Sequence, residues 1–526
     1  MLETRARKIR RICPICLICL IVLPMLCPAA GKLKMWGTPP QKKVHHQKSA
    51  AGVMMGPMPL LTQRRSETKR PPAPPKIIAN LSGFGFKEWQ GSPGSVDALL
   101  RTSTSKVDMW YGWDHLDIRK VVDKNTAGVR IREPILYMCA YYPPNLKDDE
   151  RQALRDYVLS GGSILINCCG QDSSFAGVKA ELKAMFPGRP LRLLPPDHPI
   201  YRSHFKVDQV SWPENMKDKK MKSAKELGEL NVLAELAGKK VDPKKLPRLR
   251  AVTVGTRAAV VVSYEDLACG WSQWDNQTVA RYSLGDSNAL GVNFMNYVMA
   301  EMRFAKFLQT THEIKAPNVR PRQQLTLVQL IHDGNWDPNP SGIPYLLRHL
   351  SANTSIAIKF ARRRFELQNP NLFAYPLLYM TGTWNPSLEK PEVALLRRYL
   401  TEGGTLLADS ASGRLEFDKA FRKLVKELFP NGELVKLPKD HLLYRCFYQI
   451  EDLNVNHLGK EIEPEVEAVF INYRPVIVYS PLGLCDGWAL EHSAYARAYQ
   501  PEDAFRLATN MIVYLMLTVR ESGEGK

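Results

Sequence analysis

Two adjacent thiols could do chemistry near the middle of the first half of the chain. Cys168 and Cys169 follow a short apolar run, residues 163–167, and precede Gly170. A thiol at the end of a buried strand could attack a carbonyl carbon if a nearby histidine lowered its pKa. The alternative interpretation is that two small residues fill a tight turn where the strand ends.

Two Asp-His pairs are further candidates for acid–base chemistry. Asp197 precedes His198, and Asp440 precedes His441. Each pair could exchange protons or contribute metal ligands, because histidine titrates near neutral pH. Alternatively, each pair forms a turn in which Asp bonds its own backbone and His caps the next segment. His198 joins Cys168 and Cys169 as a catalytic candidate, and Asp440 and His441 are candidate ligand-binding residues.

A ligand cleft is indicated by residues 332–338 (HDGNWDP), which combine polar side chains with a tryptophan. In α/β proteins such clefts lie where strands end. We therefore expect Asp333 and Trp336 to bind a ligand, together with Asp409 and Ser410, which follow a later apolar run. The alternative is that the tryptophan and the aspartate form a turn with a purely structural role.

Motifs for cofactors and metals are missing from the sequence. It contains no P-loop, G-x-G-x-x-G, serine-hydrolase elbow or HExxH. Six of the ten cysteines lie beyond residue 30 and form no CxxC pair, which argues against a zinc site. We expect no cofactor and no metal. An oxidising compartment would permit a disulfide, but the sequence does not choose its pairing among Cys139, Cys168, Cys169, Cys269, Cys446 and Cys485.

The chain contains a long internal repeat. Residues 133–138 (EPILYM) match 375–380 (YPLLYM) at an offset of 242, and both copies carry a Gly-Gly pair at the same offset. The Asp-His pairs match at 243, and the two Gly-Trp pairs, 270–271 and 487–488, match at 217. The fall in offset places a net insertion in the first copy, in the Lys-rich stretch near 217–245. The sequence therefore predicts two copies of one domain.

Within a copy, strands alternate with helices. Apolar runs at 135–139 and 163–167 predict buried strands, and helical spacing predicts helices at 145–160 and 175–186. Residues 251–254 and 258–262 flank a Gly-Thr-Arg turn and predict a hairpin. This order is typical of a mainly parallel sheet covered on both faces, with an antiparallel addition.

The segment 1–76 has the pattern of an export signal followed by a tether. Five basic residues precede an apolar stretch at 12–27, and small residues near Ala30 offer a cleavage site, although a retained anchor is the alternative. Residues 31–76 are basic and Pro-rich. The segment 1–80 carries +13 of the formal net charge of +19, so most of the excess is not on a folded face. We therefore expect no specific nucleic-acid binding, although this basic segment could contact a membrane surface.

The motifs of the second copy resemble those of a bacterial family known as domain of unknown function 4159. They include residues 332–338, 378–382 (LYMTG), the Gly-Gly pair at 403–404, Asp440 with His441, and 485–488 (CDGW). The first copy lacks the Asp-Gly opening and shows 86–88 (FKE) before a tryptophan. The resemblance implies a flavodoxin-like sheet similar to that of class I glutamine amidotransferases, in which a strand-turn-helix elbow presents a nucleophile. It implies no established activity.

We therefore predict two tandem flavodoxin-like, amidotransferase-like three-layer α/β domains at 77–310 and 323–520, behind a signal at 1–30 and a linker at 31–76. We expect a non-catalytic binding or scaffolding protein of the periplasm or cell exterior. Its partner would be a small molecule, a glycan or an envelope protein, bound by the second copy. The alternative is a thiol-dependent hydrolase or amidotransferase-like enzyme that uses Cys168 or Cys169.

Overall fold

The computed structural model describes residues 73–84, 94–121, 131–212, 224–236, 241–272, 280–309, 326–354, 362–455, 460–489 and 493–521. These residues belong to one compact unit, Pro72–Lys526. The predicted export signal, nearly all of the predicted tether and the FKE element of the first copy lie outside the described residues. Among the described helices, none is long and apolar enough to cross a membrane.

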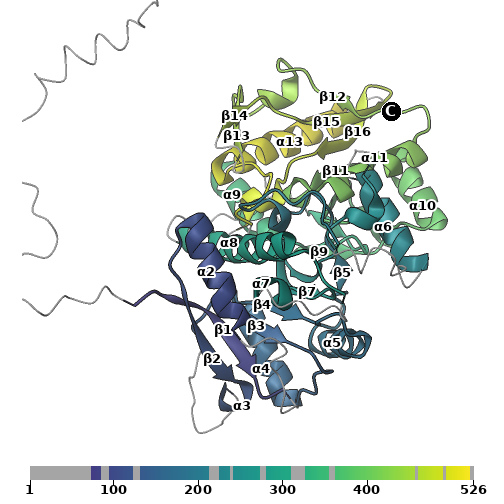
Figure 1. The fold of residues 1–526 in the computed structure, drawn as a ribbon. Coiled ribbons are helices and arrows are strands. Elements are labelled where there is room, and N and C mark those ends of the chain that lie inside the picture. Colours follow the sequence, from purple (N-terminus) through teal and green to yellow (C-terminus); the bar gives the residue numbers. More distant parts are fainter. Residues whose placement is uncertain are drawn as a thin grey trace, which may run out of the picture. The chain divides into compact units, whose positions relative to one another are not determined.

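The first copy contains one seven-stranded sheet (Figure 1). Five strands are parallel and occur in the order β2-β1-β3-β4-β7, and β6 and β5 extend the sheet in antiparallel fashion. The strands are β1 (Lys76–Ser82), β2 (Gly112–Asp117), β3 (Ile135–Cys139), β4 (Ser163–Asn167), β5 (Arg192–Leu193), β6 (Arg250–Val254) and β7 (Arg257–Ser263).

The second copy repeats this arrangement in the order β9-β8-β10-β11-β16-β15-β12, with the first five strands parallel. A small two-stranded antiparallel sheet, β13 (Leu453–Val455) with β14 (Lys460–Ile462), is added. The main strands are β8 (Val328–Leu330), β9 (Arg363–Phe365), β10 (Leu377–Gly382), β11 (Thr405–Ser410), β12 (Val435–Lys436), β15 (Glu467–Ile471) and β16 (Arg474–Ser480). The predicted pair of tandem α/β domains is confirmed, and the order of the parallel strands is that of doubly wound, flavodoxin-like sheets.

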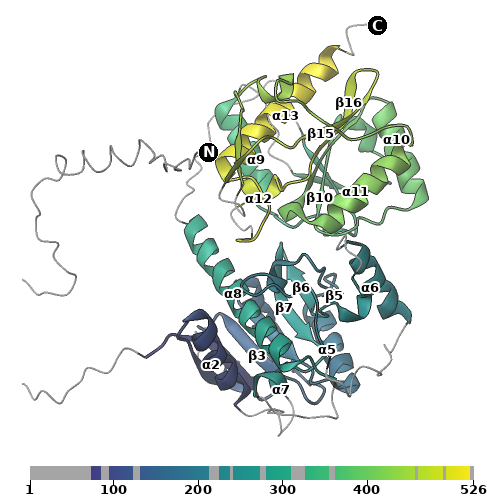
Figure 2. The ribbon, with the colours of Figure 1, turned by 45° about the horizontal axis from the view of Figure 1, so that its top comes forward.

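Helices cover both faces of each sheet (Figures 1 and 2). In the first copy, α2 (Ser95–Val107), α7 (Ala268–Trp271) and α8 (Leu284–Gln309) share one apolar core, and α4 (Asp148–Leu159) and α5 (Asp172–Met185) share the other. In the second copy, α9 (Gly342–Asn353), α12 (Cys485–Trp488) and α13 (Pro501–Glu521) lie on one face, and α10 (Lys390–Thr401) and α11 (Leu415–Leu428) on the opposite face. The remaining helices are short or peripheral: α3 (Ile118–Val121) and α6 (Ala224–Leu236), which lies within the predicted insertion.

The repeated Gly-Gly pair ends the helix before the central strand for a steric reason. Its first glycine has a left-handed backbone, with φ of 110° at Gly161 and 118° at Gly403. Its second glycine lies against a tyrosine ring, where an added Cβ would come within 2.2 Å of ring atoms of Tyr157 or Tyr399. Only glycine fits both positions without strain.

Candidate functional site

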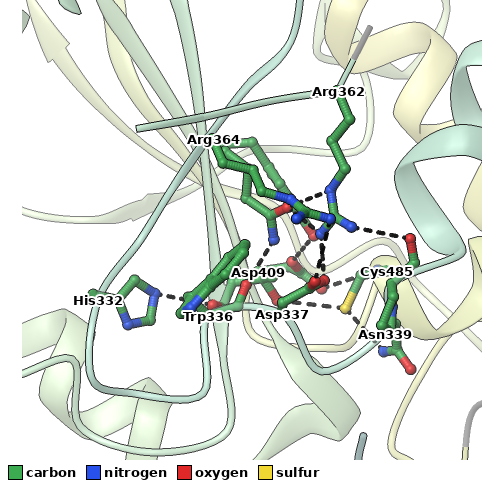
Figure 3. A network of polar contacts seen from close by, with 12 residues as sticks. His332, Trp336, Asp337, Asn339, Arg362, Arg364, Asp409 and Cys485 are labelled. Carbon is green, nitrogen blue, oxygen red and sulfur yellow. Dashed lines mark hydrogen bonds and ion pairs between the residues drawn. The ribbon is translucent and has the colours of Figure 1, made fainter. Parts of the chain in front are cut away.

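The candidate site lies beside β8 in the second copy, where the strand order reverses. The chain leaves β8 towards α9 on one face of the sheet and leaves β10 towards α10 on the other face. Such a switch point is where doubly wound sheets bind ligands. Residues 331–341 form the loop after β8, and Figure 3 shows the polar contacts around it.

A buried histidine fixes the start of this loop. His332 Nδ1 accepts a hydrogen bond of 3.0 Å from the Gly334 N–H, and its Nε2 lies 3.0 Å from the Thr381 carbonyl oxygen. Burial lowers the pKa of His332 to about 4, so the imidazole is neutral near pH 7. The Gly334 carbonyl accepts hydrogen bonds from the backbone N–H groups of Thr383 and Trp384, which joins the loops after β8 and β10. His332 therefore orders the loop.

Trp336 lies on the same loop, and two arginines from outside the loop lie close to its ring (Figure 3). The guanidinium carbon atoms of Arg362 and Arg364 lie 5.9 and 5.5 Å from the centre of its ring, within cation–π range. Arg362 forms an ion pair with Asp337, donates to Gln329 Oε1 at 2.9 Å, and has a side chain only 10% exposed. Arg364 keeps half of its side chain exposed and lies 4.0 Å from Asp337. Arg362 therefore holds the loop, while Arg364 remains open to solvent.

The buried end of the network contains Asp409. Its Oδ1 accepts a 2.6 Å hydrogen bond from the Tyr379 hydroxyl, and its Oδ2 accepts from the N–H groups of Leu484 and Cys485 at 2.7 and 3.1 Å. The carboxylate thus caps the N-terminus of α12. Burial, together with the nearby charge of Asp486, raises the pKa of Asp409 to about 6, against the opposing effect of the Tyr379 hydrogen bond.

Asp409, Cys485 and Asp486 are close enough to hold a metal ion. Their ligand atoms lie within 4.8 Å of one another, and no other such group is found among the described residues. However, Asp486 accepts hydrogen bonds from the backbone N–H and the hydroxyl of Ser412, at 2.5 and 2.8 Å. Because protein donors already point at both carboxylates, we interpret the cluster as a helix cap and a turn support.

In the first copy, a buried carboxylate also caps the corresponding helix, but it comes from a different position. Asp266 Oδ1 accepts hydrogen bonds from the N–H groups of Ala268 and Cys269, at 2.9 and 3.4 Å, at the start of α7. It also accepts a 2.8 Å hydrogen bond from Asn167 Nδ2, and Asn167 is the counterpart of Asp409. The two copies therefore supply the capping carboxylate from different strand ends.

The structure does not join the three catalytic candidates into a reactive group. Cys168 and Cys169 are buried; burial raises the pKa of Cys168 to about 12, and the contact with Cys139 together with burial raises that of Cys169 well above its usual value. His198 Nδ1 instead accepts a 3.2 Å hydrogen bond from the Ile200 N–H. Among the described residues, no hydrogen bond links either sulfur to a histidine. A thiolate nucleophile is therefore disfavoured.

The other predicted ligand-binding residues make no contacts with the arginines of this network among the described residues. His441 Nδ1 accepts a 3.2 Å hydrogen bond from the Leu443 N–H, and the preceding Asp440 is exposed. Ser410 is buried and donates to the Arg414 carbonyl oxygen at 2.9 Å. Asp333 is exposed, and within the described part of the chain its carboxylate contacts no donor.

Sequence reasoning missed the arginines of the site. Arg362 and Arg364 lie far beyond Trp336 in the sequence, past the whole of α9. Only the parallel pairing of β9 with β8 brings them to its ring. The run of arginines at 362–364 was the available signal, although a charged run on an edge strand usually only prevents aggregation.

The fold defines a protein made of two tandem doubly wound α/β domains, and the candidate site lies at the strand ends of the second. The model of the family described as "Domain of unknown function (DUF4159)" matches residues 93–299 and 325–516, so the chain belongs to this family in two copies. No curated protein matches the chain. Among solved structures, a "putative phosphosugar isomerase from SILICIBACTER POMEROYI DSS-3" aligns at 11% identity over 64% of this chain and 75% of its own, with a TM-score of 0.13 that supports no argument.

Proposed function

We propose that this protein is an exported, non-catalytic binding protein of the cell envelope whose second copy carries the ligand site. Export rests on the basic and apolar pattern of the segment 1–30. The observation that supports the binding site is that Trp336, in the loop after β8, and the exposed Arg364, on β9, lie together at the switch point. We call Asp333, Trp336 and Arg364 the rim.

The rim is preorganised for binding. His332 and Arg362 hold the loop by hydrogen bonds to the backbone of Thr381 and Pro340, so little conformational entropy is lost when a ligand binds. A half-buried indole, an exposed guanidinium and the exposed carboxylate of Asp333 complement a ligand with a flat apolar face, hydroxyl groups and a negative charge. An acidic sugar of an envelope glycan has this chemistry.

A thiol-dependent hydrolase is the less favourable assignment. The sulfurs that it needs are buried, and the pKa of each is raised, so neither is a thiolate near pH 7. No comparable obstacle exists at the rim, because Arg364 and Asp333 already face solvent.

The role of the rim in ligand binding can be tested with two substitutions of exposed residues, Asp333→Asn and Arg364→Gln. We expect the wild-type protein to bind acidic oligosaccharides on a glycan array, and each substitution to weaken binding by about tenfold, since one charged hydrogen bond is worth about 1.5–3 kcal/mol. Affinities are then measured by titration calorimetry with the best array ligand.

The matched control is Arg398→Gln, because Arg398 is also an exposed arginine of the second copy, on α10, with its side chain 66% exposed. It should bind as tightly as the wild type. Equal affinities for the wild type and both rim variants would show that the ligand binds elsewhere. No binding to any acidic or neutral glycan would reject the ligand class.

A further inference from the structure

Two thiols of the first copy face each other at the ends of neighbouring strands. Cys139 is the last residue of β3 and pairs in register with Asn167, the last residue of β4. Cys169 follows shortly after Asn167, and its sulfur lies 3.4 Å from the sulfur of Cys139. Both residues are 4% exposed, so their side chains meet inside the domain.

The local backbone aims Cys169 at this neighbour. Its φ of 51° is left-handed, which turns the chain sharply after β4. The sulfur also lies 3.4 Å from Asn167 Nδ2, which fixes its orientation. The energy cost of a left-handed cysteine is small but real, so the surrounding contacts must maintain this conformation.

We propose that Cys139 and Cys169 form a disulfide bond when the protein folds in an oxidising environment. A disulfide has a sulfur–sulfur distance of about 2.05 Å, so the sulfurs at 3.4 Å must approach by little more than about 1 Å. Because Cys139 ends β3 and Cys169 follows the end of the neighbouring β4, a small rotation of each side chain is enough to close this gap.

The rival pairings are less favourable. Cys168 contributes to the apolar core on the opposite face of the sheet, with α4 and α5, whereas Cys139 and Cys169 contribute to the core with α2, α7 and α8. Cys269 has its own partner, because its thiol hydrogen-bonds Asp266. The pair is also specific to the first copy, since the counterpart of Cys139 is Thr381.

The reaction balances as a thiol–disulfide exchange. One protein thiolate attacks oxidised glutathione and releases one glutathione thiol, which leaves a mixed disulfide on the protein. The second protein thiolate attacks the protein sulfur of that mixed disulfide and releases the other glutathione thiol. Two protein thiols are oxidised and one glutathione disulfide is reduced. Since both sulfurs are buried in the folded domain, the exchange takes place during folding.

The test uses the full chain, refolded from denaturant in a buffer of reduced and oxidised glutathione, then alkylated and digested with trypsin without reduction. We expect peptide 133–147, which holds Cys139, to be linked to peptide 156–179, which holds Cys168 and Cys169. The link should persist in Cys168→Ser and disappear in Cys169→Ser. Circular dichroism before digestion checks that each variant is folded, and the wild-type map identifies the linked peptides without any variant.

Stability gives a second readout. Closing a loop of about 30 residues should make the melting temperature of the oxidised protein higher than that of the reduced protein by up to about 10 °C. Cys139→Ser should melt at the same temperature with and without reductant. The proposal is wrong if oxidised wild-type protein shows no linked peptides, if the link survives in Cys169→Ser, or if peptide 133–147 is linked to peptide 258–281, which holds Cys269. None of these outcomes depends on whether the protein is exported or binds a glycan.

Discussion

Three histidines share one structural role. In His198, His332 and His441, Nδ1 accepts a hydrogen bond from the backbone N–H two positions later. This interaction requires a neutral ring nitrogen, and burial lowers the pKa of all three. These histidines therefore fix turns as asparagine or aspartate often does, which is the alternative that the sequence left open for the Asp-His pairs.

Acid should destabilise the second copy through His332. The folded pKa of about 4 lies below the ordinary value of 6.5, so the unfolded state binds the proton first as the pH falls. The stabilisation is complete above pH 6.5 and is lost as the pH falls towards 4. We expect the wild type to lose up to about 3 kcal/mol more than His332→Asn between pH 7 and pH 4.

Urea unfolding at each pH measures this difference. Asparagine is a suitable replacement because its side-chain oxygen can accept the Gly334 hydrogen bond without titrating. Parallel pH profiles for the two proteins would show that the His332 imidazole is equally basic in the folded and unfolded states.

At the scale of elements, the short helices α7 and α12 show how the two copies diverged. Each N-terminus is capped by one buried carboxylate, supplied by Asp266 in the first copy and by Asp409 in the second. The counterpart of Asp266 is Gly483, where an added Cβ would lie 2.0 Å from Asp486 Oδ2. The capping carboxylate therefore occupies different positions in the two copies, and the residues around it differ as well.

Exchanging the caps tests this explanation. Asp409→Ala should lower the free energy of unfolding by about 3 kcal/mol, because the Tyr379 hydroxyl and two N–H groups lose a buried acceptor. The triple variant Asp409→Asn, Gly483→Asp, Asp486→Cys installs the pattern of the first copy and should be more stable than Asp409→Ala, because a carboxylate again accepts from the N-terminus of α12. Urea unfolding monitored by tyrosine and tryptophan fluorescence compares them. A triple variant as unstable as Asp409→Ala would contradict the equivalence of the caps.

At the scale of the whole molecule, polar contacts join the two copies. Glu301 of α8 accepts a 2.5 Å hydrogen bond from the Ser493 hydroxyl and a 3.1 Å bond from the Ala494 N–H. Arg192 forms a 2.7 Å ion pair with Glu416 of α11. Because Glu301 is buried, solvent screens its contact with Ser493 and Ala494 less than it would screen a contact at the surface. Burial also raises the pKa of Glu301.

Removing this contact should uncouple the two copies. Glu301→Ala leaves the Ser493 hydroxyl and the Ala494 N–H without their acceptor, at a cost of about 2–3 kcal/mol. We expect scanning calorimetry to show two separated unfolding transitions in place of one. Glu301→Gln keeps an oxygen acceptor and serves as the control with a single transition. A single, unshifted transition for Glu301→Ala would show that other contacts, such as the Arg192–Glu416 ion pair, are enough to couple the copies.

The regular elements were largely predictable from local pattern. The strands predicted at 135–139 and 163–167 have the predicted bounds, and the hairpin is formed by β6 and β7. The helix predicted at 175–186 begins earlier, at Asp172, because its first residues are polar and carry little periodic signal, although Ser174 is buried. The candidate site was less predictable: Trp336 belongs to the network, but Asp333 and Asp440 make no part of it, and its arginines were missed.

The sequence by itself determined the duplication, the alternation of strands and helices and the family, because repeats, periodicity and glycine stops are local properties of a chain. Only the tertiary structure decided which side chains meet. It brought Arg362 to Trp336 and Cys139 to Cys169, and it directed the histidines to their own backbone. The physical reason is that strand order and the face on which each helix packs set these distances, and no single segment of the sequence specifies either of them.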